Sequence, residues 1–103
     1  MPEVFERFGS IAIRRMFGGH GVYRDGLMFA LVTGDTLYLK TDPVIAAEFE
    51  SRGLPSFEFR RQGRLMTTSY RQAPAEVLED RDVAAEWARR SFEAALRARN
   101  KKK

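Results

Sequence analysis

Three glycines and a histidine stand together in Gly-Gly-His-Gly, residues 18–21. A glycine-rich loop binds phosphate when its amides and the N-terminus of a following helix point at the anion. Here the loop leads into Val22 and Tyr23, which favour a strand, and no Gly-Lys-Ser/Thr ending follows. A nucleophile elbow would need a serine between glycines at a strand-to-helix turn. The segment therefore predicts backbone geometry, not a phosphate loop or a catalytic turn.

The other reactive side chains are too few or too scattered to form a recognisable site. His20 is the only histidine and cysteine is absent, so two histidine ligands, a thiolate nucleophile and a disulfide are all excluded within one chain. Ser69 has no candidate base near it in the sequence. The carboxylates of Glu79, Asp80 and Asp82 precede a predicted helix, where they complement the helix dipole. We therefore expect a protein that is not an enzyme and binds neither a metal ion nor a cofactor.

Turn residues divide the chain into short elements that would position these side chains. Asp25-Gly26 and Gln62-Gly63 predict tight hairpin turns, because both central residues of such a turn take positive φ. Alternation of apolar residues predicts strands, and apolar spacing of three and four predicts helices. The expected elements are a short helix at 2–8, strands at 11–23, 27–32 and 36–40, a helix at 42–53, strands at 57–60 and 64–70, one helical turn at 74–78 and a helix from about 80 to 99.

This order, α-β-β-β-α-β-β-α with hairpin-length loops inside each strand group, predicts an α+β fold of two layers. An antiparallel sheet of about five strands would pack against the helices. The apolar run Leu27–Val32 favours a central strand that is covered on both faces. Gly18 and Gly19 would allow one long strand over residues 11–23 to bend sharply. The full set of expected structural glycines is Gly18, Gly19, Gly21, Gly26 and Gly63.

Positive charge is concentrated at the C-terminal end of the chain. Residues 1–88 hold eleven Lys and Arg against thirteen Asp and Glu, whereas residues 89–103 hold seven against one. We therefore expect a single domain over residues 1–99, followed by a basic tail over residues 100–103. The longest apolar run is too short to cross a bilayer, and no apolar signal segment is evident near the N-terminus. A cytoplasmic protein is the expectation.

The candidate partner-binding residues are five arginines on predicted strands: Arg14, Arg15, Arg60, Arg61 and Arg64. In the simplest interpretation they are solvated, since charge on a strand discourages aggregation between sheets. An apolar sheet face left uncovered by helices would instead mark an interface with another protein or a second copy. The arginines that alternate with phenylalanines at positions 57 and 59 could also contact phosphates and bases.

Several motifs occur in an order that resembles one family. They are RRMFGGHGVYRDGLMFALVTGDTLYLKTD, GLPSFEF, SYRQAP and LEDRDVAAEWA. Together they are similar to the N-terminal domain of the TfoX (Sxy) family of bacterial competence regulators, over about residues 4–97. The resemblance implies a small α+β domain with an antiparallel sheet and packed helices, without catalytic residues or a cofactor.

The resemblance also implies a role in the regulation of transcription. Full-length members act with the activator CRP to switch on DNA-uptake genes. They also carry a second domain resembling helix-hairpin-helix modules. We expect this chain to be a stand-alone N-terminal domain. The leading hypothesis is a non-enzymatic regulatory or protein-interaction module, with the transcription machinery or a CRP-type activator as partner and a homodimer as a further expectation. The alternative is direct, weakly specific binding of nucleic acid, in which the hairpin arginines and the aromatic residues at 57, 59 and 70 contact phosphates and bases and the tail at 100–103 adds positive charge.

Overall fold

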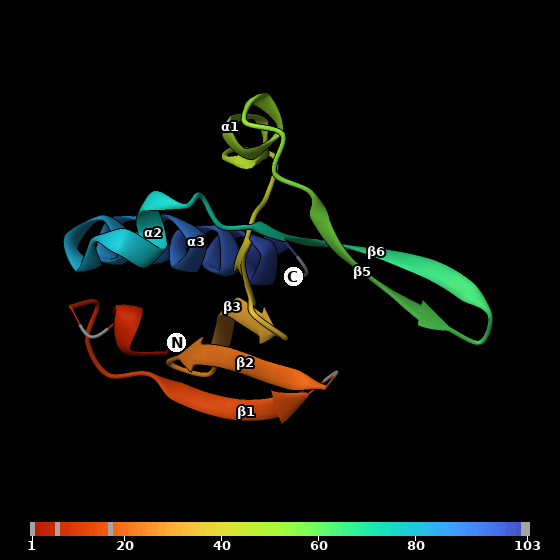
Figure 1. Ribbon diagram of the computed structural model, residues 1–103, viewed down its shortest axis with the longest axis horizontal. Coiled ribbons are helices and arrows are strands. Elements are labelled where there is room, and N and C mark those ends of the chain that lie inside the picture. Colours follow the sequence, from red (N-terminus) through yellow and green to blue (C-terminus); the bar gives the residue numbers. More distant parts are fainter. Residues whose placement is uncertain (1, 6, 17, 102–103) are drawn as a thin grey trace.

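The computed structural model describes residues 2–5, 7–16 and 18–101. In that part of the chain, strands form one sheet and helices pack against it (Figure 1). The strands are β1 (Ala12–Met16), β2 (Gly19–Arg24), β3 (Leu27–Thr33), β4 (Thr36–Lys40), β5 (Ser56–Arg61) and β6 (Arg64–Gln72). The helices are η1 (Pro2–Phe5, a 3-10 helix), α1 (Ala46–Ser51), α2 (Glu76–Glu79) and α3 (Arg81–Lys101).

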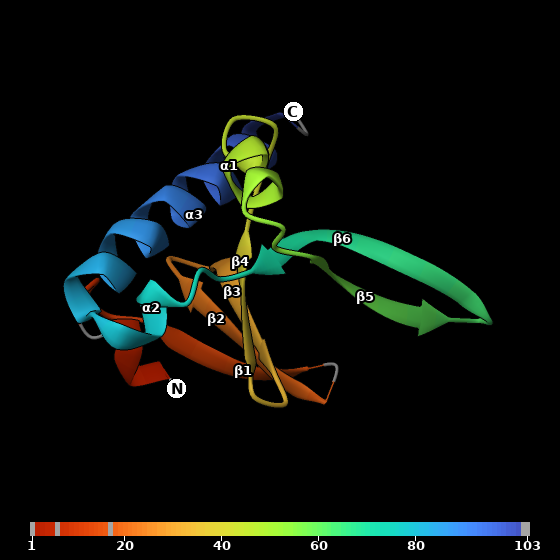
Figure 2. The same ribbon diagram turned by 45° about the horizontal axis from the view of Figure 1, so that its top comes forward.

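The strands are ordered β1-β2-β3-β4-β6-β5, and every neighbouring pair is antiparallel. The predicted α+β class with an antiparallel sheet is therefore confirmed, although the sheet has six strands and not about five. Figure 2 shows that the β5–β6 hairpin forms one end of this sheet and extends away from the helices.

The extra strand comes from the segment predicted as one bent strand over residues 11–23, and that prediction is wrong. Met16 pairs with Gly19, so the chain reverses there and β1 and β2 are antiparallel neighbours. Gly18 takes a φ of +73°, a turn conformation that glycine adopts without a steric penalty. Phe17 belonged to the predicted strand and lies outside the described residues.

The two predicted Xaa-Gly hairpin turns are confirmed by their backbone angles. Asp25 and Gly26 have φ values of 52° and 79°, and Gln62 and Gly63 have 52° and 78°. Positive φ at both central residues matches the right-handed twist of the flanking strands. These turns fix the register of the β2–β3 and β5–β6 pairs.

An aspartate caps α3, as its position in the sequence predicts, whereas the helix predicted over 42–53 begins only at Ala46, after a turn that follows Asp42. The Oδ1 of Asp80 accepts hydrogen bonds from the backbone amides of Asp82 and Val83, at 2.8 and 3.3 Å, which caps α3. The Oδ1 of Asp42 accepts in the same way from Val44, at 3.1 Å, ahead of α1. In the predicted tail, residues 100 and 101 continue α3, and residues 102 and 103 lie outside the described residues.

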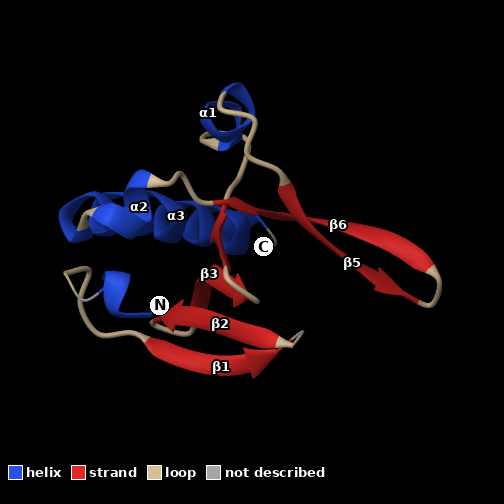
Figure 3. Cartoon of the chain, in the orientation of Figure 1, coloured by secondary structure: helices blue, strands red, loops and turns tan. Residues whose placement is uncertain are grey.

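The hydrophobic core lies between one face of the sheet and the helices. Figure 3 shows α2 and α3 on one side of β1 and β2. A bulge at Phe29, where Val22 pairs with Ala30 and Tyr23 with Met28, lets β3 send both Phe29 and Ala30 into this core. Every described helix contributes to it: Phe5 from η1, Phe49 from α1, Val77 from α2 and several small residues with Trp87 from α3. All the described helices therefore pack on the same face of the sheet.

The opposite face of the central strand is covered by side chains of the sheet itself. Leu31 lies on this face, paired with Gly21 on one side and Tyr38 on the other, and is only 1% exposed. A Cβ at Gly21 would meet the ends of Met16, Tyr23 and Met28, so these side chains converge over the sheet. The prediction of a central strand buried on both faces is confirmed, but the expectation that another helix or a second subunit covers the second face is wrong, because side chains of the sheet cover it.

Candidate interaction surface

The five predicted arginines are all exposed, and they divide between two places in the fold. Arg14 and Arg15 lie on the edge strand β1, and they point to opposite faces because side chains alternate along a strand. Arg60, Arg61 and Arg64 lie around the turn of the β5–β6 hairpin. The structure thus brings together three of the five arginines and leaves the other two on a separate strand.

The sheet face that carries no helix has a distinct composition. We call it the helix-free face and define it by Arg14, Met16, Tyr23, Met28, Leu31 and Tyr38, which share one side of β1–β4 by register. The guanidinium of Arg14 lies 5.4 Å from the centre of the Tyr23 ring, a cation–π contact. Methionine, tyrosine and arginine are enriched at the centres of protein interfaces.

The β5–β6 hairpin, which we call the arm (residues 56–72), projects beyond the helices (Figures 1 and 2). At its base, the rings of Phe57 and Phe59 stack at 6.1 Å, and Tyr38 contacts Phe57 edge-on. Beyond this cluster, every residue from 60 to 67 is exposed, including Leu65 (54%) and Met66 (40%). The distal arm is therefore a ribbon with both faces in solvent.

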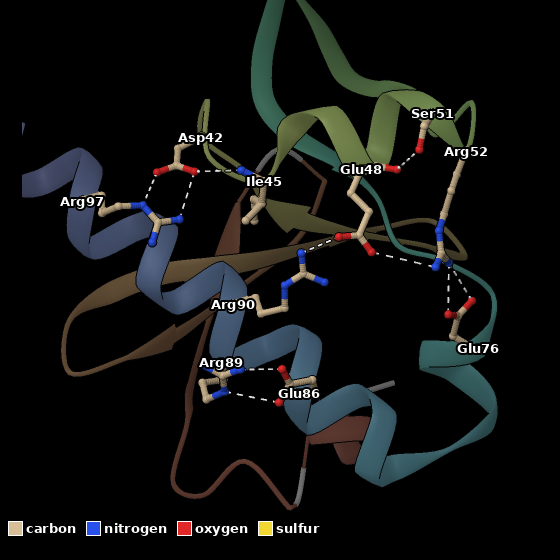
Figure 4. Close-up of polar contacts among 10 residues, drawn as sticks. All are labelled: Asp42, Ile45, Glu48, Ser51, Arg52, Glu76, Glu86, Arg89, Arg90 and Arg97. Atoms are coloured by element: carbon tan, nitrogen blue, oxygen red, sulfur yellow. Dashed lines mark hydrogen bonds and ion pairs between the residues drawn. The ribbon is translucent and has the colours of Figure 1, made fainter.

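Arginines of the helical layer are paired with carboxylates (Figure 4). Arg97 donates to both oxygens of Asp42, and Arg90 donates to Glu48, which ties α3 to α1 and the loop before it. Arg52 donates to both oxygens of Glu76 at 3.0 Å and joins α1 to α2. These contacts hold the helices together.

The electrostatic effect of these pairs is visible on the acidic side chains. The hydrogen bond from Arg97 is the main cause that lowers the pKa of Asp42, and the hydrogen bond from Arg90 does the same for the pKa of Glu48. Both carboxylates are therefore held in the charged form. A carboxylate with a lowered pKa is a weak general base, so this cluster is suited to structure and not to acid–base chemistry.

The contact between Lys40 and Ser69 has no counterpart in the sequence prediction. The ammonium of Lys40 donates a hydrogen bond to the Ser69 hydroxyl and lies 5.4 Å from the centre of the Tyr70 ring. The backbone amide and hydroxyl of Thr41 both donate to the Ser69 carbonyl, each at 2.7 Å. The contacts therefore fasten β4 to β6.

The residues that the structure describes offer no group of three or more His, Asp or Glu side chains arranged to hold a metal ion. A hollow of about 610 Å³, open to solvent, lies between α3 and the segment after η1. Its charged lining is already paired within the chain, Arg7 with Asp82 and Arg89 with Glu86 and Glu93. Among the described helices, none is both long and apolar enough to span a membrane.

Comparison with known proteins gives two matches. Residues 3–95 match the family described as the TfoX N-terminal domain. A curated relative, "DNA transformation protein TfoX1" of Aliivibrio fischeri (strain ATCC 700601 / ES114), is 32% identical over 65 residues. The match covers 63% of this chain and 31% of that protein, so the aligned part spans about a third of the relative's length.

Proposed function

Because this chain belongs to the TfoX N-terminal domain family, we propose that it is a non-enzymatic regulatory module that acts by binding a protein partner. The name of the curated relative connects that protein with DNA transformation. By extension, the process that this module controls is the expression of bacterial DNA-uptake genes, and its place of action is the cytoplasm, where transcription occurs.

A binding role agrees with the chemistry of the described side chains. The acidic groups of Asp42 and Glu48 are held charged by arginines. The Ser69 hydroxyl is paired with a lysine that acts as a donor. An acyl-transfer or proton-transfer site would need a nucleophile, a base and a group that orients the base. The described residues supply no such set, which favours recognition over catalysis.

The observation that carries the proposal is the helix-free face. All the described helices pack on the other side of the sheet, so a partner would meet the side chains that cover Leu31 on this face. It presents two methionines, two tyrosines and Arg14, a composition typical of interface centres. Methionine side chains adapt to irregular partner surfaces because they are unbranched and flexible. The expected partner is a protein of the transcription machinery or a CRP-type activator.

The test is capture of partners from a native lysate by the purified protein, with two matched variants. One variant carries Arg14→Glu and Met16→Glu on the helix-free face. The control carries Ile13→Glu and Arg15→Glu, on the same strand but the opposite face, with the same change of charge. We expect the first variant to lose the partner by about 30-fold, because central interface residues are worth about 2 kcal/mol or more.

The captured protein is then identified and the complex is rebuilt from purified components. Equal capture by the two variants would contradict the proposal, provided that both variants melt at the temperature of the native protein. Light scattering separates one further outcome. A homodimer that only the Arg14/Met16 variant dissociates would assign the helix-free face to a second copy of this chain.

A further inference from the structure

The arm differs in charge from the rest of the described chain. Residues 56–72 contain four arginines and one glutamate. Arg71, at the base, is engaged with the Leu54 carbonyl, the Ser56 hydroxyl and Glu50. Toward the tip, the only carboxylate is Glu58, whose nearest polar side-chain contact is the Thr67 hydroxyl at 3.5 Å. The distal arm is therefore a patch of positive charge on a projecting element.

The three distal guanidinium groups are not used by the fold. Among residues 2–5, 7–16 and 18–101, Arg60, Arg61 and Arg64 make no ion pair or side-chain hydrogen bond. Five arginines of the helical side contrast with them, since each is paired with a carboxylate: Arg7, Arg52, Arg89, Arg90 and Arg97. Unpaired cations clustered on a projecting ribbon fit an external anion.

The register places these cations on both faces of the ribbon. Arg61 pairs across the hairpin with Arg64, so both point to one face, together with Phe59 and Met66. Arg60 pairs with Leu65 and points to the other face. A ligand that contacts all three arginines must therefore have a groove with negative charge on both walls, because a flat acidic surface would contact only one face of the arm.

From this geometry we propose that the arm binds the phosphate backbone of duplex DNA, with the tip inserted into a groove. The major groove of B-DNA is about 12 Å wide and admits a two-stranded β-ribbon. Phosphates line both walls of the groove, which matches cations on both faces of the arm. The planar fork of arginine also suits phosphate oxygens better than a point charge does. This contact is separate from the protein contact on the helix-free face.

Phosphate contacts fix position and do not read sequence, so the binding shows little preference among duplexes. The expected strength follows from counterion release, which lowers log K by about 0.9 per phosphate contact for each tenfold rise in salt. Three arginines then contribute a slope of about 2.7, which is about a 40-fold loss of affinity between 50 and 200 mM salt.

The experiment is a fluorescence-anisotropy titration of a labelled 20-base-pair duplex with the full chain, repeated across a salt series. The test variant replaces Arg60, Arg61 and Arg64 with glutamine. The control variant replaces Lys101, Lys102 and Lys103 with glutamine, which removes the same charge from the basic end of the chain. A third variant replaces the three arginines with lysine and keeps the charge of the arm. Thermal melts verify that all four proteins fold.

For the variant with glutamine in the arm, we expect the slope of log K against log salt concentration to be less steep than the native slope by about 2.7. The tail variant should retain most of the native slope, and the variant with lysine in the arm should stay near it. Equal losses for the arm and tail variants would overturn the proposal, because binding would then follow net charge alone. Two other results would also overturn it. One is tighter binding to a single strand of the same length, and the other is competition by polyglutamate as effective as competition by unlabelled duplex, which would indicate an acidic protein surface.

Discussion

Gly19 provides the sharpest test of how the sheet depends on its glycines. A Cβ at this position would lie 1.9 Å from the Val32 carbonyl oxygen and 2.9 Å from the Thr33 Cα. Both atoms belong to the backbone of β3, which pairs with β2 at this point. A rotamer change cannot relieve the overlap, so Gly19→Ala must push the two strands apart.

The expected cost follows from that geometry. Overpacking a well-packed site costs about 1–3 kcal/mol and sometimes more, and the backbone overlap at Gly19 places Gly19→Ala near the top of this range. For a domain of this size, 1 kcal/mol corresponds to about 4–8 °C in melting temperature, so we expect a fall of about 12–24 °C.

The neighbouring glycines are the matched controls. Gly18 has a φ of +73° but nothing within 4 Å of its added Cβ, so Gly18→Ala pays only the left-handed penalty of about 1 kcal/mol. At Gly21 the nearest atoms are the movable ends of Met28, Met16 and Tyr23, so the cost of Gly21→Ala falls between the other two.

The assay is thermal and urea denaturation of the three variants, followed by circular dichroism. The predicted order of destabilisation is Gly19→Ala, then Gly21→Ala, then Gly18→Ala. A Gly19→Ala protein that melts at or above the temperature of Gly18→Ala would refute the argument from strand contact.

Two further substitutions test the packing of α3 and its link to the segment before α1. The buried hydroxyl of Ser91 is 0% exposed and has no hydrogen-bond partner among the described residues, so Ser91→Ala should stabilise the protein by about 1 kcal/mol in urea denaturation; a lower stability would contradict this reading. Asp42 has a pKa below its ordinary value of 3.8 because Arg97 donates a hydrogen bond to it. The charged carboxylate therefore stabilises the folded protein fully above pH 3.8, and this stabilisation is lost as the pH falls through the lower pKa of the folded state. Asp42→Asn should therefore destabilise the protein most at neutral pH, and the difference from native should shrink toward pH 2 in denaturation curves; a difference independent of pH would count against the ion pair.

Local turn chemistry made much of the sheet predictable from the sequence. Asp25-Gly26 and Gln62-Gly63 predicted two hairpins, because few residue pairs tolerate positive φ at both positions. The same reasoning failed at Gly18 and Gly19. The requirement for glycine at position 19 comes from the β3 backbone across the ladder, a contact that the local sequence does not reveal.

The candidate surface was predictable to a similar extent. Arg60, Arg61 and Arg64 flank a predicted turn, so their proximity on one hairpin follows from the sequence. The pairing of other arginines does not, since Arg90 and Arg97 lie 42 and 55 residues from their acidic partners. Because the sequence does not reveal these ion pairs, it cannot show that the arginines of the arm differ from Arg90 and Arg97 in lacking an acidic partner.

We propose that this protein regulates gene expression through a partner bound on its helix-free face. The most direct measurement is the transcription of DNA-uptake genes in a strain that lacks the native gene and is complemented with variants at equal protein levels. We expect the native protein and the Ile13→Glu/Arg15→Glu control to restore transcription, and Arg14→Glu/Met16→Glu to fail to restore it. Restoration by the Arg14/Met16 variant, or no effect of the native protein, would contradict it.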